Sequence, residues 1–111
     1  MEITEIRIDD ELSHIALSGR LDANGIKTLD LKFYGFTSGR HKNAIVDMSG
    51  VDFMSSIGVR MILKAAKALN AEGLKFVLLS PTEFVREVLD TAGLLDIFIV
   101  ADDLDAAMQQ L

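Results

Sequence analysis

The sequence has 111 residues, of which half are hydrophobic, with a formal net charge of −6 at pH 7 and no cysteine. This length fits one domain with a real core, the missing thiols exclude disulfides and zinc–thiolate sites, and the negative charge opposes non-specific binding to nucleic acids or anionic membranes. No apolar run approaches a membrane span, and the acidic, alternating N-terminus is unlike a signal peptide. We therefore expect one domain over residues 1–111, cytoplasmic, monomeric or weakly dimeric, without a cofactor and suited to a protein partner.

The first two predicted elements are strands that form a hairpin. Apolar and acidic residues alternate over Glu2–Ile8, and a less regular alternation follows an acidic turn over Leu12–Leu17. His14 falls on this second strand, where we expect it to face solvent. The segment Gly19–Asp22 ends the hairpin, and Asp22 is suited to cap the helix that follows.

A helix and a buried strand come next. Apolar residues recur at helical spacing, and the run Thr37–Gly39 stops the helix; the apolar positions are Ile26, Leu29, Phe33 and Phe36. The short apolar run Ala44–Met48, ended by a Ser-Gly pair, predicts a central strand covered on both faces.

The next predicted helix runs from Ser55 or Ser56 to Ala71. Its inner face consists of Gly58, Met61, Ile62, Ala65, Ala66 and Leu69. A basic stripe of Arg60, Lys64 and Lys67 lies on one face with Ser56. A solvated helix surface is the simpler interpretation of this stripe, and a functional surface is the alternative.

The last third of the chain repeats the alternation of strand and helix. A buried strand over Leu74–Leu79 precedes a helix that we expect Ser80 to cap, with Pro81 in its first turn. That helix ends at Gly93, and Ile97–Val100 forms the final strand. Either Asp102 or Asp103 then caps a terminal helix, whose predicted inward residues are Leu104, Ala107, Met108 and Leu111.

The element order is therefore β-β-α-β-α-β-α-β-α. Strands separated by helices favour parallel neighbours, and the opening hairpin adds an antiparallel edge. We expect a small α/β domain with a mixed, mainly parallel sheet and helices packed against it.

The stretch Asp47–Arg60 is the strongest candidate for a functional site. It predicts a strand end, a loop with adjacent serines and a helix N-terminus, where an anion is favoured, although such serines are also ordinary helix caps. Phosphate-loop, dinucleotide, zinc-protease and serine-hydrolase motifs are absent, so the sequence indicates neither a catalytic residue nor a metal site. A phospho-accepting Asp47 at the end of its strand is an alternative.

Several segments resemble the STAS domain, most closely the single-domain anti-sigma factor antagonists of bacteria. The matching parts are Leu17–Asp22, Val46–Arg60, Ser80-Pro81 and Val88–Leu94, and the resemblance covers almost the full chain. It implies a non-enzymatic protein that binds a serine-kinase anti-sigma factor and frees a sigma factor. The family's kinase phosphorylates a Ser or Thr in a D-S-[ST]-G motif at the head of the second helix, and a phosphatase reverses this.

This chain departs from that motif. Aligned on Gly58, the usual acceptor position is Ile57, the usual Asp position is Ser55, and Ser56 matches the serine before the acceptor. Either Ser56 or Ser55 has taken the acceptor role, or the chain is a non-phosphorylated STAS module, such as a subunit of a lipid-transport complex or a signalling scaffold. The resemblance implies a partner-binding surface made of Asp22, Met54, Ser55, Ser56, Ile57 and Arg60.

Overall fold

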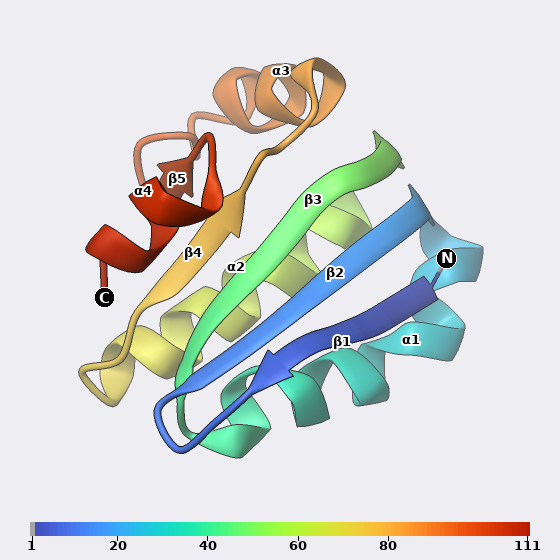
Figure 1. The fold of residues 1–111 in the computed structure, drawn as a ribbon. Helices are drawn as coiled ribbons and strands as arrows, with labels where there is room; N and C mark the ends of the chain where they lie inside the picture. Colours follow the sequence, from blue (N-terminus) through green and yellow to red (C-terminus); the bar gives the residue numbers. More distant parts are fainter. Residues whose placement is uncertain (1) are drawn as a thin grey trace.

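The computed structural model describes residues 2–111, in which five strands and four α-helices follow the predicted order (Figure 1). The elements are β1 (Glu2–Ile8), β2 (Leu12–Leu21), α1 (Ala23–Phe36), the 3₁₀ helix η1 (Ser38–Arg40), β3 (Asn43–Met54), α2 (Ser56–Ala71), β4 (Phe76–Leu79), α3 (Glu83–Thr91), β5 (Ile99–Ala101) and α4 (Leu104–Gln109).

The strands form one sheet in the order β1-β2-β3-β4-β5. β1 pairs with β2 antiparallel, and the other neighbours are parallel, which confirms the predicted mixed sheet. Figure 1 shows α1 and α2 side by side on one face and α4 on the opposite face, over β4 and β5. The opposite face in front of β1, β2 and most of β3 carries no helix.

The two faces bury apolar clusters of very different size. The larger cluster lies under α1 and α2 and includes Leu17, Leu21, Phe33, Val46 and Ile62. The smaller one lies under α4 and consists of Leu12, Ile45, Val77, Leu79, Ala101 and Ala107, with two partly buried neighbours. The large cluster supplies most of the apolar burial that stabilises the fold, and it supports the helix that begins at Ser56.

β2 and β3 are both longer than the sequence indicates. β3 continues through the Ser-Gly pair to Met54, and β2 continues to Leu21, because the two strands keep pairing beyond local irregularities as far as Leu21 opposite Met54. At Gly50, a Cβ would lie 2.9 Å from the Ser18 Cβ, so the glycine permits close approach of the strands rather than a turn.

The cap of α3 is also corrected. Thr82, not Ser80, is the N-cap, and its hydroxyl accepts the Val85 N–H at 3.3 Å. Ser80 has a positive φ of 50°, and its hydroxyl donates to the Asp102 carbonyl at 2.8 Å. The loop between β4 and α3 therefore uses Ser80 to hold the segment after β5, and the helix begins later.

At the C-terminus, Asp103 caps α4 by accepting the Ala106 N–H. Of the four residues expected to point inward, only Ala107 is buried, whereas Leu104, Met108 and Leu111 are exposed. The helix has six residues and lies over β4 and β5 only, so it has room to bury one small side chain rather than an apolar stripe.

The prediction that His14 faces solvent is wrong. Its exposed fraction is 5%, and its Nε2 has no hydrogen-bond partner among residues 2–111. Burial lowers the pKa of His14, the nearby Asp47 carboxylate opposes this shift, and Arg7 adds to it. β2 is an inner strand that pairs with β1 and β3 at His14, and burial by segments distant in the chain is not readable from the local pattern.

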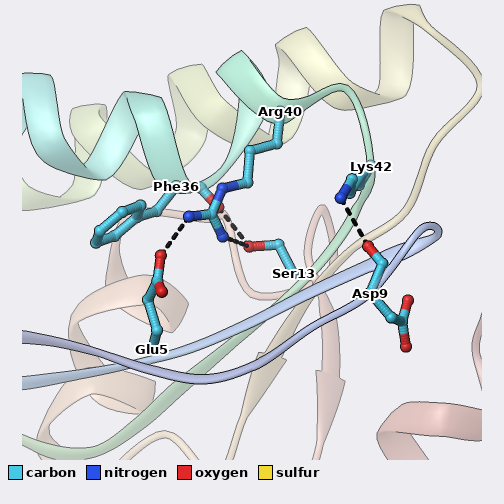
Figure 2. A network of polar contacts seen from close by, with 6 residues as sticks. All are labelled: Glu5, Asp9, Ser13, Phe36, Arg40 and Lys42. Atoms are coloured by element: carbon cyan, nitrogen blue, oxygen red, sulfur yellow. Dashed lines mark hydrogen bonds and ion pairs between the residues drawn. The ribbon is translucent and has the colours of Figure 1, made fainter.

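A polar cluster fastens α1 to the hairpin near the β1–β2 turn (Figure 2). The Ser13 hydroxyl donates to the Phe36 carbonyl at 2.6 Å, and the Arg40 guanidinium donates to the Ser13 hydroxyl at 3.0 Å and pairs with Glu5. The same guanidinium lies 4.7 Å from the centre of the Phe36 ring. We call these four residues the Arg40 cluster.

The adjoining turn is fastened in the same way. Lys42 donates to the Asp9 carbonyl at 2.7 Å, and the Asp9 carboxylate accepts the N–H groups of Glu11 and Leu12. The Glu11 N–H is the main cause of the lowered pKa of Asp9. The acidic turn expected from the sequence is thus held by the Asp9 carboxylate and by Lys42.

Candidate functional site

The strands β2 and β3 end side by side at the end of the sheet where α1 and α2 begin (Figure 1). Ser55 joins them: its backbone N–H and its hydroxyl both donate to the Leu21 carbonyl, each at 3.0 Å. The loop between β3 and α2 is therefore fixed to the end of β2.

The two serines have different environments. Ser55 is the N-cap of α2 by position, but its hydroxyl makes no capping bond because it is turned toward Leu21. Ser56 is the first residue of α2 and is exposed. A serine therefore occupies the cap position, as expected from the sequence, but its hydroxyl bonds to Leu21 instead of to the helix. Of the two serines, only Ser56 presents an exposed side chain.

Gly58 lets α2 start in close contact with β2. A Cβ at this position would lie 2.8 Å from the Leu21 carbonyl oxygen and 2.9 Å from the Leu21 Cβ, distances that real Cβ atoms essentially never show. The expectation that Gly58 belongs to the inner face is confirmed, and the contact explains why a side chain is excluded there.

Ile57 lies between these fixed points and faces outward, with an exposed fraction of 41%. Arg60 follows one turn later and is exposed as well. Since Ser55 and Gly58 are both held against Leu21, the backbone of the first turn of α2, which carries Ile57, is fixed in place.

Asp22 lies across the Leu21 backbone from this turn. Its carboxylate caps α1 by accepting the Gly25 N–H at 2.9 Å, and it accepts the Arg20 Nε–H at 3.3 Å. The Gly25 bond, aided by Arg20, lowers the pKa of Asp22. The residue is partly exposed, so a charged carboxylate borders the head of α2.

Met54 has a different place from the one expected. Only 2% of it is exposed, and it belongs to the large apolar cluster. This corrects the expectation that Met54 contacts a partner; its side chain supports the loop from beneath.

An aromatic group that the sequence pattern did not identify extends this end of the molecule. The Arg20 guanidinium lies 4.1 Å from the centre of the Phe53 ring, which lies 5.6 Å from the Phe84 ring. Phe84 belongs to α3, and its side chain is exposed. Only the extension of β2 and β3 past their predicted ends brings Arg20 beside Phe53.

A metal site and a phospho-accepting Asp47 are two chemical alternatives for the described residues. Within residues 2–111, no three His, Asp or Glu side chains are placed to hold a metal ion. Asp47 lies inside β3 rather than at its end, and its carboxylate accepts the Ser49 N–H at 2.9 Å. The strand-end geometry on which the phospho-accepting alternative depends is thus not present.

Residues 2–111 also contain no helix that is both long and apolar enough to span a membrane.

Comparison with known sequences identifies similar proteins. The model of the STAS domain family matches residues 4–107. A protein of Bordetella bronchiseptica, BtrV, named as a candidate anti-sigma factor antagonist, is 30% identical over 107 residues, which cover 96% of this chain and 91% of that protein.

Solved structures share the fold. A candidate anti-sigma factor antagonist from Thermotoga maritima has a TM-score of 0.83 at 23% identity, with 94% of this chain and 90% of that one covered. The anti-sigma factor antagonist SpoIIAA in its unphosphorylated form has a TM-score of 0.77 at 23% identity, covering 98% and 95%. The phosphorylated form of SpoIIAA, from Bacillus, has a TM-score of 0.69 at 22% identity, covering 98% of both chains.

Proposed function

The chain belongs to the STAS domain family, and we propose that it is an anti-sigma factor antagonist, which binds an anti-sigma factor and thereby frees a sigma factor. The observation that carries this proposal is the exposed Ile57 on the rigid first turn of α2, in a relative of a protein named as such an antagonist. The proposal places the protein in the cytoplasm and gives it a binding role rather than a catalytic one.

The geometry suits a protein contact. An apolar residue at the centre of a contact is most effective when its backbone does not have to be ordered on binding. Ile57 meets this condition through the Ser55 and Gly58 contacts to Leu21. The partly exposed Asp22 and the exposed Arg60 supply charges near Ile57, as expected for the polar rim of an interface.

We further propose that the partner is of the serine-kinase type and that Ile57 makes the contact independent of phosphorylation. An isoleucine carries no hydroxyl, so a kinase cannot switch this contact off directly. Ser56 is the better candidate of the two serines for modification, because it is exposed whereas the Ser55 hydroxyl is bonded to Leu21. A phosphate on Ser56 would lie one turn from Arg60 and add about −1.5 to −2 charge.

Replacing Ile57 with aspartate tests the contact. We expect Ile57→Asp to weaken binding to the purified serine-kinase anti-sigma factor at least roughly tenfold, because a charge would be desolvated at the centre of the interface. Isothermal titration calorimetry measures the affinity, and urea unfolding checks the fold.

Ile97→Asp is the matched control, since Ile97 is exposed at 55% in the segment before β5. Its affinity should equal that of the unmodified protein. Unchanged affinity in a folded Ile57→Asp variant would rule out Ile57 as the contact.

Intact mass measurement of the protein from its own host tests the role of Ser56. We expect no added phosphate, which would appear as about 80 Da on the first turn of α2. A phosphate on Ser56 that disappears in Ser56→Ala would instead make the protein a switch with a displaced acceptor, reset by a serine phosphatase.

A second candidate is a STAS subunit of a lipid-transport complex or a signalling scaffold. The isoleucine at the acceptor position favours it, since such a subunit needs no phosphorylation. A gene neighbourhood that encodes a permease, with no kinase and no phosphatase, would support this alternative.

A further inference from the structure

A groove runs between α1 and α2 on the surface of the molecule. Its main hollow has a volume of about 340 Å³. It is lined by Asp30, Leu31, Phe33, Tyr34, Ser38, Met61, Lys64, Ala65 and Ala68. We call this hollow, together with the smaller one beside it, the α1–α2 groove.

The α1–α2 groove leads directly to the candidate contact. The smaller hollow is lined by Ile57 and Arg60 and shares Asp30, Met61 and Lys64 with the main one. At 1.5 Å per helical residue, the distance along α2 from Ile57 to Ala68 is roughly 16 Å, which matches about three turns of a second helix.

The rim of the groove is unusually apolar for an exposed helix surface. Leu31 is 84% exposed and Tyr34 is 53% exposed, although both lie on a helix whose buried side already fills the core. With Ile57 they form a row of three large exposed side chains along one groove. The alanines of α2 leave room for a second backbone to approach closely.

The α2 edge of the groove carries more positive than negative charge, with one carboxylate, Asp30, also lining both hollows. Arg60 and Lys64 line it, and Lys64 and Lys67 continue the basic stripe on the outer side of α2. No residue in the described part of the chain forms an ion pair with any of these three cations, whereas Arg7, Arg20, Arg40 and Arg86 are all paired. In a protein of net charge −6, this unpaired basic edge favours an acidic partner surface.

We propose that the α1–α2 groove binds an amphipathic helix of the same partner that contacts Ile57, with apolar side chains against Leu31 and Tyr34 and acidic side chains against Lys64 and Lys67. A helix in a groove uses apolar anchors at positions such as i, i+4 and i+7, and its flanking charges set the orientation. This inference rests on the proposed function for the nature of the partner, and it adds the second segment that the partner must supply.

Photocrosslinking in the host tests this directly. The photoreactive residue p-benzoylphenylalanine replaces Tyr34 in one strain, Ile57 in a second and Ile97 in a third, which is the off-groove control. Mass spectrometry then identifies each captured protein and the peptide that carries the crosslink. We expect the Tyr34 and Ile57 probes to capture one protein through different segments, and the Tyr34 segment to be helical, apolar on one side and acidic.

Charge reversal then tests the recognition with that captured protein, purified. Lys64→Glu should weaken its affinity roughly tenfold or more, because attraction becomes repulsion. Lys75→Glu is the matched control in the exposed segment before β4 and should bind as the unmodified protein does. Equal affinity for the two variants would overturn the electrostatic part of the proposal.

The outcomes separate the two proposals. If the probe at position 57 captures an anti-sigma factor and the probe at position 34 captures nothing, the groove proposal is overturned and the proposed function stands. Capture of a second copy of this chain by Tyr34 makes the groove a dimer contact and also overturns it. If both probes capture the same protein and it is not an anti-sigma factor, the groove proposal stands and the proposed function is lost. Capture by neither probe overturns both.

Discussion

The two ends of the sheet are held to the helices by different means. Near the β1–β2 turn, the Arg40 cluster uses charged and polar side chains that pair with one another. At the head of α2, the Leu21 carbonyl receives the N–H and hydroxyl of Ser55, and Gly58 fits without a side chain. In the first arrangement the side chains are engaged in contacts within the protein, whereas the second leaves Ser56, Ile57 and Arg60 exposed for binding.

The cations illustrate the same difference. Arg40 is bonded on several sides, while the basic stripe of Arg60, Lys64 and Lys67 has no ion-pair partner within residues 2–111. A partly buried cation with several contacts, such as Arg40, contributes to stability, whereas an exposed cation without a partner contributes little. The comparison therefore predicts that changes at the two ends alter different properties.

The largest effect is expected at the backbone contact of α2. Gly58→Ala should lower the free energy of unfolding by about 1–3 kcal/mol, since the new methyl overlaps the Leu21 carbonyl oxygen. Urea unfolding measures the change. Gly35→Ala is the control inside α1, where a Cβ has no neighbour within 4 Å, and it should raise stability by about 0.4–1 kcal/mol. A stable Gly58→Ala variant would mean that α2 does not need this close approach.

A smaller effect is expected from removing the cation of the Arg40 cluster. Arg40→Ala should cost about 1–2 kcal/mol, because the Ser13 bond and the ring contact are lost while the Glu5 pair is partly screened by solvent. Arg60→Ala should change stability by less than about 0.5 kcal/mol and weaken partner binding instead. If both variants unfolded at the same urea concentration, paired and unpaired cations would not differ as we infer.

The smallest effect concerns pH and His14. Burial lowers the pKa of His14 in the folded state. Once the pH falls below the pKa of the unfolded state, near 6.5, the unfolded protein therefore binds a proton at His14 more readily than the folded protein does. Stability is therefore complete above that pH and declines as the pH falls toward the folded pKa. His14→Gln should flatten the dependence of the urea midpoint between about pH 7.5 and 5.5. Parallel curves for the two proteins would exclude His14 as the source.

The sequence indicated most residues of the candidate site, but not the contacts that hold them in place. The basic stripe was identified from helical spacing and the Ser pair from its place before a predicted helix, whereas Ile57 was singled out by the resemblance to the STAS domain. Met54 was misplaced because the pattern ended β3 too early. The α1–α2 groove was not predicted, because its existence depends on how far apart two helices lie. In the sequence, Leu31 cannot be distinguished from an apolar residue of the core.

Local chemistry in the sequence determined the order of elements, the mixed sheet and the inner face of α2, because capping residues and apolar periodicity act over a few neighbours. Tertiary structure alone decided the extension of β2 and β3, the burial of His14, the place of Thr82 rather than Ser80 as the cap, and the exposure of the last helix. These depend on backbone pairing and coverage by segments distant in the chain, which override local preference when a neighbouring strand offers hydrogen bonds or a helix is too short to cover the sheet.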